Sequence, residues 1–218
     1  MISSSSRCSG GVVPATSMAN HESSAAFTAT IINTGSELLL GRTLNTHGMF
    51  LSQALWPLGI EVVRQVTLPD GDVIGVELER AMCESDVVLV TGGLGPTSDD
   101  LSAEAAAKAK TVPLTLNQTW FTHLTNKYLQ SGRSLSKSNE KQAWLPQGSD
   151  LIDNPVGTAC GFSFTFNKAR FYFTPGVPHE FKQMISEPIM ADIQQRFQPV
   201  VVPTLVKLSC FGISESKL

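Results

Sequence analysis

The sequence predicts an α/β fold of three layers, in which helices cover both faces of a mostly parallel sheet and a small β-hairpin is added. Between residues 28 and 90, short β-branched segments alternate with amphipathic segments at helical spacing, a pattern typical of βαβ units. The chain has 218 residues and is 42% hydrophobic, so it can bury one large core. One main domain is therefore expected.

The first half of this domain is predicted to contain three strands and two helices. A run rich in Thr and Ile predicts a strand at 28–33, and apolar spacing predicts a helix at 45–58 that Gly59 ends. A strand at 60–68 leads into turn residues, from which Asp70 or Asp72 can cap a helix that carries Ile74 and Leu78 on one face. A third strand is expected at 86–90.

The second half adds helices at 103–109 and 117–130, followed by a β-hairpin of segments 161–166 and 170–174. Pro178 then opens a helix that runs toward Phe197, and a strand-like segment follows at 200–211. The expected domains are a disordered Ser- and Ala-rich tail at 1–27, the main domain at 28–198, and the truncated start of a following segment at 199–218.

Composition excludes several classes of function. The formal charge is −3 without a basic run, so no nucleic-acid partner is expected, and no stretch is apolar enough to span a membrane. The cysteines lie far apart and form no CxxC pair, which argues against a zinc site or a disulfide scaffold and favours reduced thiols in a cytoplasmic protein. The histidines show no ligand spacing, and no G-x-S-x-G elbow supports serine catalysis.

The candidate binding residues follow the predicted strands, because ligands of parallel α/β sheets bind beyond the carboxyl ends of the strands. The first strand is followed by Gly35 and Glu37, the second by Asp70, and a later one by Pro175 and Gly176. The third strand leads into a glycine-rich loop that contains Gly92, Gly93, Gly95, Thr97, Asp99 and Asp100. All of these residues are expected at one edge of the sheet.

The glycine-rich loop has two interpretations. Its backbone N–H groups can cradle a phosphate, or the loop can be no more than a tight turn. It lacks the third glycine of a Rossmann fingerprint and the Gly-Lys-Ser/Thr of a P-loop.

The acidic residues also have two interpretations. Asp99 and Asp100 can cap the next helix and offset its dipole, or Asp100 can join Asp70 in holding Mg²⁺ beside a phosphate. Glu37 is a candidate third ligand, although it can equally be an acid in the first turn of a helix.

Several motifs, in the same order, resemble those of the molybdopterin-binding domain family, and more closely the amino-terminal domain of the CinA-like proteins. They are Gly35 to Gly41, Thr91 to Leu101, Ser138 to Ala143, Asn154 to Phe162, and Pro175 to Glu180. The resemblance implies a homo-oligomer, such as a dimer, that binds a nucleotide or pterin with a divalent metal ion, and K⁺ is a further candidate. It also implies that Lys141, Thr97 and Asp99 bind substrate and that Asp70 and Asp100 are catalytic metal ligands.

Three functions follow from these residues and the resemblance. The first is metal-dependent hydrolysis of a nucleotide diphosphate sugar such as ADP-ribose to AMP and ribose 5-phosphate. The second is molybdopterin or nucleotide binding with adenylyl transfer. The third is a non-catalytic nucleotide-binding regulatory module, favoured by Glu140 at a position where the family usually has a basic residue. The deamidase domain of the CinA-like proteins has no counterpart in this sequence, so that activity is not predicted.

Overall fold

The computed structural model describes residues 26–198, 204, 211 and 212. Its strands are β1 Phe27–Thr34, β2 Ile60–Leu68, β3 Val87–Thr91, β4 Leu114–Leu116, β5 Trp144–Pro146, β6 Asp150–Ile152, β7 Gly161–Phe166 and β8 Ala169–Thr174. Its helices are α1 Ser36–Leu39, α2 His47–Leu55, α3 Val73–Glu84, α4 Ser102–Lys110, α5 Gln118–Gln130, α6 Lys137–Glu140, α7 Pro178–Met184 and α8 Met190–Arg196. Short 3₁₀ turns lie at Trp56–Leu58 and Lys141–Ala143, and a π-helical turn lies at Ile185–Ile189.

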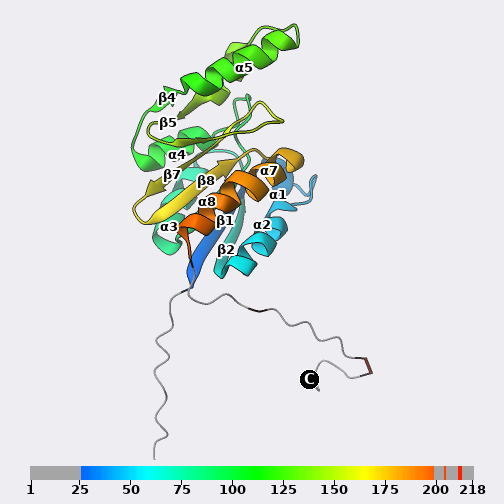
Figure 1. Ribbon diagram of the computed structural model, residues 1–218, viewed down its shortest axis with the longest axis vertical. Coiled ribbons are helices and arrows are strands. Elements are labelled where there is room, and N and C mark those ends of the chain that lie inside the picture. The colour runs from blue at the N-terminus through cyan, green and yellow to red at the C-terminus, as the bar shows by residue number, and fades with distance from the viewer. Residues whose placement is uncertain (1–25, 199–203, 205–210, 213–218) are drawn as a thin grey trace, which may run out of the picture.

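The main sheet has the strand order β2-β1-β3-β8-β7-β6 (Figure 1). The first four strands of this order are parallel to one another, whereas β7 is antiparallel to both β8 and β6. The predicted mostly parallel sheet is confirmed. The predicted hairpin is confirmed as β7 and β8, and both of its strands belong to the main sheet because β8 also pairs with β3. A separate antiparallel pair, β4 and β5, was not predicted.

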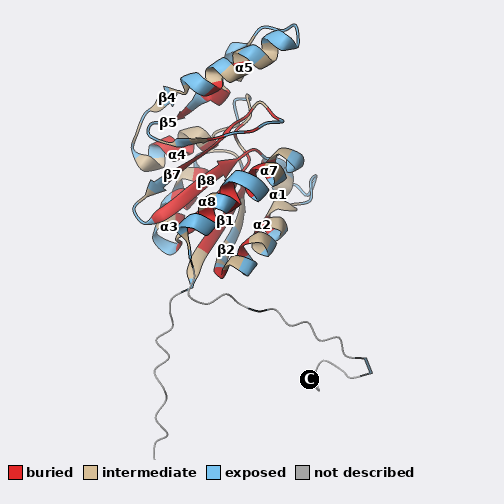
Figure 2. Cartoon of the chain, in the orientation of Figure 1, coloured by how far each residue is buried: buried red, intermediate tan, exposed pale blue. Residues whose placement is uncertain are grey.

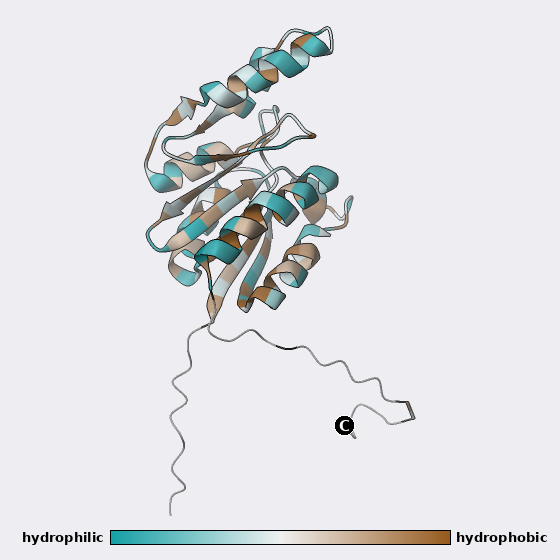
Figure 3. Ribbon diagram, viewed as in Figure 1, coloured by the Kyte–Doolittle hydropathy of each residue, from teal (hydrophilic) through white to brown (hydrophobic). Residues whose placement is uncertain are grey.

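Helices pack on both faces of this sheet, which gives the predicted three layers (Figure 1). Alternation along β3 divides its side chains: Val88 and Val90 face the cluster that includes α3, α4 and α5, while Val87 and Leu89 face α2, α7 and α8. The central strands are buried on both faces and the helices expose their outer sides (Figure 2). Hydropathy follows the same division, with hydrophobic residues gathered on the inner elements (Figure 3).

Two of the predicted helices differ from the prediction where the backbone changes from α-helical to 3₁₀ or π-helical geometry. The helix expected at 45–58 begins at His47 and turns into 3₁₀ geometry at Trp56, before Pro57. Asp72 occupies the N-cap position of α3, but no side-chain hydrogen bond caps the helix. The helix expected from Pro178 toward Phe197 is present, with the π-helical turn around Pro188.

Some expectations concern segments beyond the description. The tail predicted at 1–27 lies outside the described residues up to residue 25, and Phe27 begins β1. The strand-like segment at 200–211 and the following segment at 199–218 also lie outside, apart from residues 204, 211 and 212. In the described part of the chain, no helix is both long and apolar enough to cross a membrane.

Candidate functional site

The four parallel strands end at one edge of the sheet, and a cavity of about 450 Å³ lies there. The loops after β1, β2, β3 and β8 all contribute to its lining, as the strand-end argument predicted. Of the predicted glycine and proline residues, the lining includes Gly35, Gly92, Gly93, Gly95, Pro175 and Gly176. The predicted acids Glu37, Asp70, Asp99 and Asp100 line it as well.

The glycine-rich loop approaches the end of β1 so closely that Gly92 cannot carry a side chain. Its φ is +105°, and an added Cβ would lie 2.3 Å from the carbonyl oxygen of Thr34. The Gly92 N–H donates to the carbonyl of Thr174, at the end of β8. The next three N–H groups, those of Gly93, Leu94 and Gly95, donate no hydrogen bond within the described part of the chain. The loop is therefore a tight turn that also presents free donors beside the cavity.

The two aspartates that follow the glycines fold back onto Thr97. An oxygen of Asp100 accepts hydrogen bonds from the backbone N–H of Thr97, at 2.9 Å, and from its hydroxyl, at 2.6 Å. The same hydroxyl bonds Asp99, and this hydrogen bond is the main reason that the pKa of Asp99 lies below its ordinary value. Neither aspartate caps α4, because Leu101 holds the N-cap position and no side chain bonds the helix end. The capping interpretation is thus wrong.

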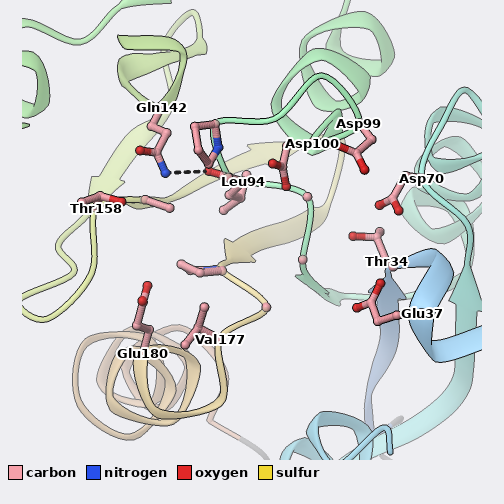
Figure 4. Close-up of a pocket in the computed structure, with 18 residues that line it drawn as sticks. Thr34, Glu37, Asp70, Leu94, Asp99, Asp100, Gln142, Thr158, Val177 and Glu180 are labelled. Carbon is pink, nitrogen blue, oxygen red and sulfur yellow. Dashed lines mark hydrogen bonds between the residues drawn. The ribbon is translucent and has the colours of Figure 1, made fainter. Parts of the chain in front are cut away.

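Asp70 reaches the first loop rather than its own helix. One of its oxygens accepts from the backbone N–H of Ser36 at 3.1 Å and lies 3.3 Å from the Ser36 hydroxyl. This contact draws the loop after β2 against the loop after β1. Asp70, Glu37 and Asp100 consequently face one cavity from three different strand ends (Figure 4).

Lys141 and Thr97, both predicted to bind substrate, are not among the residues that line this cavity. The Lys141 ammonium group donates to the carbonyls of Thr97 and Asp100 and lies 3.2 Å from a carboxylate oxygen of Glu104. Lys141 therefore bonds the glycine-rich loop without lining the cavity. Contact of either residue with a substrate stays a prediction.

The lining carries acids but no cationic side chain. Glu37, Asp70, Asp99, Asp100 and Glu180 contribute carboxylates, and no Lys, Arg or His lines the cavity among the described residues. In the same part of the chain, no group of three or more His, Cys, Asp or Glu side chains is arranged to hold a metal ion by itself. A cation at this site would therefore take one or two of these carboxylates and complete its coordination with water or ligand oxygens.

A second, smaller cavity of about 90 Å³ adjoins the first behind Glu37. His47 lines it, stacks on Phe181 with ring centroids 3.9 Å apart, and bonds the hydroxyl of Thr91 through Nδ1 at 2.8 Å. Burial, with a smaller contribution from the charge of Lys182, lowers the pKa of His47 to about 4. His47 is therefore neutral near pH 7.

Part of the lining was not predicted. Gln142, Thr158, Val177 and Glu180 form the wall opposite most of the predicted acids (Figure 4). Gln142 comes from the 3₁₀ turn before β5, and Thr158 from the loop between β6 and β7. These segments do not directly follow parallel strands, so the strand-end argument could not select them. Their motifs were visible only through the family resemblance.

The fold agrees with the result of comparison with known proteins. A family model described as "Probable molybdopterin binding domain" matches residues 30–195. The chain belongs to this molybdopterin-binding domain family.

Within the family, CinA-like proteins are close relatives. Those of Shewanella amazonensis and Shewanella halifaxensis are each 46% identical over 190 residues, covering 86% of this chain and 45% of the relative. The chain thus spans less than half the length of these relatives.

Solved structures of the family have the same fold. A CinA protein of unknown function from Thermoplasma acidophilum is 33% identical, has a TM-score of 0.71, and matches over 77% of this chain and 98% of its own. The Mog protein of molybdopterin biosynthesis from Mycobacterium ulcerans is 16% identical, has a TM-score of 0.52, and matches over 78% of this chain and 95% of its own. The second similarity concerns the fold alone.

Proposed function

We propose that this molybdopterin-binding domain binds a phosphate-bearing pterin or nucleotide in the cavity at the strand ends. The observation that carries the proposal is the set of free N–H groups of Gly93, Leu94 and Gly95 beside the cavity. Successive backbone N–H groups in a turn form an anion site, and here they lie at the edge of a parallel sheet where ligands bind. The family match supports a pterin, and a nucleotide offers the same phosphate chemistry.

Because the lining is rich in carboxylates, we expect a cation to bind together with the phosphate. Two unit charges 4 Å apart interact by about 4 kcal/mol at the effective dielectric constant near a protein surface, so a bare phosphate facing several carboxylates would be repelled. Hard oxygen donors without nitrogen or sulfur ligands suit Mg²⁺, which is usually bound through one or two carboxylates and substrate phosphates. Asp70 and Asp100 are the proposed holders, because each is oriented by hydrogen bonds from a neighbouring loop residue.

Calorimetric titration tests this proposal. Neopterin triphosphate, ADP-ribose and ADP serve as probes, each with and without Mg²⁺. At least one probe is expected to bind, and only with Mg²⁺. Asp100→Asn is expected to weaken that binding about 10- to 100-fold, since interactions with a charged group contribute about 1.5–3 kcal/mol. Glu61→Gln, the same change of charge at an exposed position on β2, is the matched control and should leave binding unaltered. If no probe binds with Mg²⁺, the proposal is wrong.

Hydrolysis of a nucleotide diphosphate sugar is the second candidate. The carboxylates favour it, because one of them can accept a proton from water while the free N–H groups stabilise charge on the diphosphate. Water would attack phosphorus and the P–O bond of the diphosphate would break, so that ADP-ribose yields AMP and ribose 5-phosphate. Bound Mg²⁺ would supply Lewis-acid polarisation of the phosphate. Incubation with ADP-ribose and each of several divalent metals, followed by chromatography to detect AMP, tests for hydrolysis. Binding without AMP release would favour the non-catalytic module.

A further inference from the structure

A hydrogen-bond network centred on Asn154 supports the wall formed by Gln142, Thr158, Val177 and Glu180. This asparagine is fully buried between β6 and β7. Its side-chain oxygen accepts from the backbone N–H groups of Val156 and Gly157, at 3.2 and 2.9 Å. Its amide nitrogen must then face the acceptors on its other side, the carbonyl of Ala159 and a carboxylate oxygen of Glu180, each at 2.7 Å. All the hydrogen-bonding groups of the amide are used, and its orientation is fixed.

Asn154 in turn fixes Glu180, which lies in the first turn of α7. The bond from Asn154 holds Oε2, and the backbone of Gly157 passes so close that a Cβ there would lie 2.0 Å from the same oxygen. Helix α5 secures the loop from outside: Lys127 donates to the carbonyls of Val156 and Gly157, and the indole of Trp120 donates to that of Thr158. The carboxylate is therefore positioned in advance at the cavity wall.

The side chains of Glu180 and Gln142 each offer an acceptor without a partner on this wall. Within the described part of the chain, Oε1 of Glu180 has no hydrogen-bond or ion-pair partner, and no cationic side chain lines the cavity beside it. The amide nitrogen of the Gln142 side chain donates a hydrogen bond to the carbonyl of Leu94, while its oxygen is buried without a partner among the described residues. Gln142 is only 6% exposed. A ligand that contacts these two oxygens must therefore bring donors.

We propose that this wall binds the 2-amino-4-oxopyrimidine edge of a ring, the edge that pterins and guanine share, with Glu180 as its specificity-determining residue. The inference rests on the proposed function, because it seats the phosphate of the same ligand at the glycine-rich loop on the other wall. The cavity volume of about 450 Å³ is in the range of sites that hold such molecules. The ring lies between the two walls, with Val177 as an apolar neighbour.

The hydrogen-bond donors and acceptors along the edge of each ring decide which rings can pair with the Glu180 carboxylate. In pterins and guanine, the 2-amino group and the adjacent ring N–H are two parallel donors, which match the free Oε1 of Glu180 and the remaining acceptor site of Oε2 beside its bond from Asn154. Adenine instead offers its amino donor next to a ring nitrogen with a lone pair, which repels a carboxylate oxygen. Hypoxanthine retains the ring N–H but lacks the amino group, so it keeps one donor of the two. Sites built for a ligand donor discriminate strongly against analogues that lack it.

Titrations of GDP, IDP and ADP in the presence of Mg²⁺ test the inference with the phosphate kept constant. The wild-type protein is expected to bind GDP about 10- to 100-fold more tightly than ADP, with IDP between them, since each hydrogen bond to a charged group is worth about a factor of ten or more. Glu180→Gln preserves the shape of the side chain but turns one acceptor into a donor. It should abolish the preference for GDP while leaving ADP binding within about threefold.

Glu37→Gln on the opposite wall is the matched control, because it removes an equal charge near the phosphate and should shift all three nucleotides together. The ratio of GDP to ADP affinity is measured on one folded sample, so it also remains meaningful if Glu180→Gln lowers stability. Equal affinities for GDP and ADP in the wild type, or an unchanged ratio in Glu180→Gln, would overturn the inference and leave the proposed function standing. Binding of none of these nucleotides, nor of neopterin triphosphate, would overturn both.

Discussion

Replacement of Gly92 by alanine tests whether the geometry of the glycine-rich loop is a structural requirement. A non-glycine residue at a φ of +105° costs about 1–3 kcal/mol of backbone strain. The added Cβ would also lie 2.3 Å from the carbonyl oxygen of Thr34, which is fixed at the end of a buried strand. Forcing an atom into packed structure costs about 1–3 kcal/mol more. Gly92→Ala should therefore lower the free energy of unfolding by about 2–6 kcal/mol.

Urea denaturation followed by circular dichroism measures this loss as a lower midpoint at an unchanged slope. Gly75→Ala is the matched control: Gly75 lies inside α3, and a Cβ there would meet no atom within 4 Å. Because alanine favours the helix, this control should raise the free energy of unfolding by about 0.5–1 kcal/mol. The reasoning is refuted if both substitutions shift the midpoint in the same direction or if Gly92→Ala leaves it unchanged.

Two further predictions concern His47 and Lys141. The pKa of His47 is about 4 in the folded protein and about 6.5 in the unfolded chain, so the unfolded chain takes up the proton first as the pH falls. The contribution of neutral His47 to the free energy of unfolding should therefore be fully present above pH 6.5 and decrease toward pH 4. His47→Gln should flatten that part of the curve of urea midpoint against pH, and an unchanged slope would contradict the assignment. Lys141→Met should leave the carbonyl of Asp100 without its donor and remove one of the two donors to the carbonyl of Thr97, cost about 1–3 kcal/mol and speed amide exchange at Thr97. The same change at exposed Lys137 should do neither.

The sequence predicted elements well where local chemistry marks their ends. Strand β2 has its predicted bounds because Gly59 adopts the left-handed conformation before it and Pro69 follows it. The pair of β4 and β5 was missed because each strand has only three residues and pairs with a partner far away in the chain. Such short strands show no alternation that a sequence pattern can reveal.

The candidate site was predictable on one side only. Parallel strands bring their carboxyl ends together, so the glycines and acids that follow β1, β2, β3 and β8 could be assigned to one edge. The opposite wall depends on Asn154, whose buried hydrogen bonds place Glu180, and on a loop held by α5. Such tertiary hydrogen bonds leave no periodic signal in the sequence. The partner of Asp100 was also unpredictable, because a carboxylate at a helix start can bond several nearby donors.

The position of β8 has a consequence for how this domain can be made and divided. This strand is late in the chain, yet it lies in the middle of the sheet, next to β3, and supplies Pro175 and Gly176 just beyond its end. During synthesis, β1, β2 and β3 emerge with one side of β3 unpaired, and the cavity at the strand ends cannot close until residues beyond 176 have left the ribosome. A fragment that stops before β8 would thus expose a hydrophobic strand edge prone to aggregation instead of retaining part of the cavity.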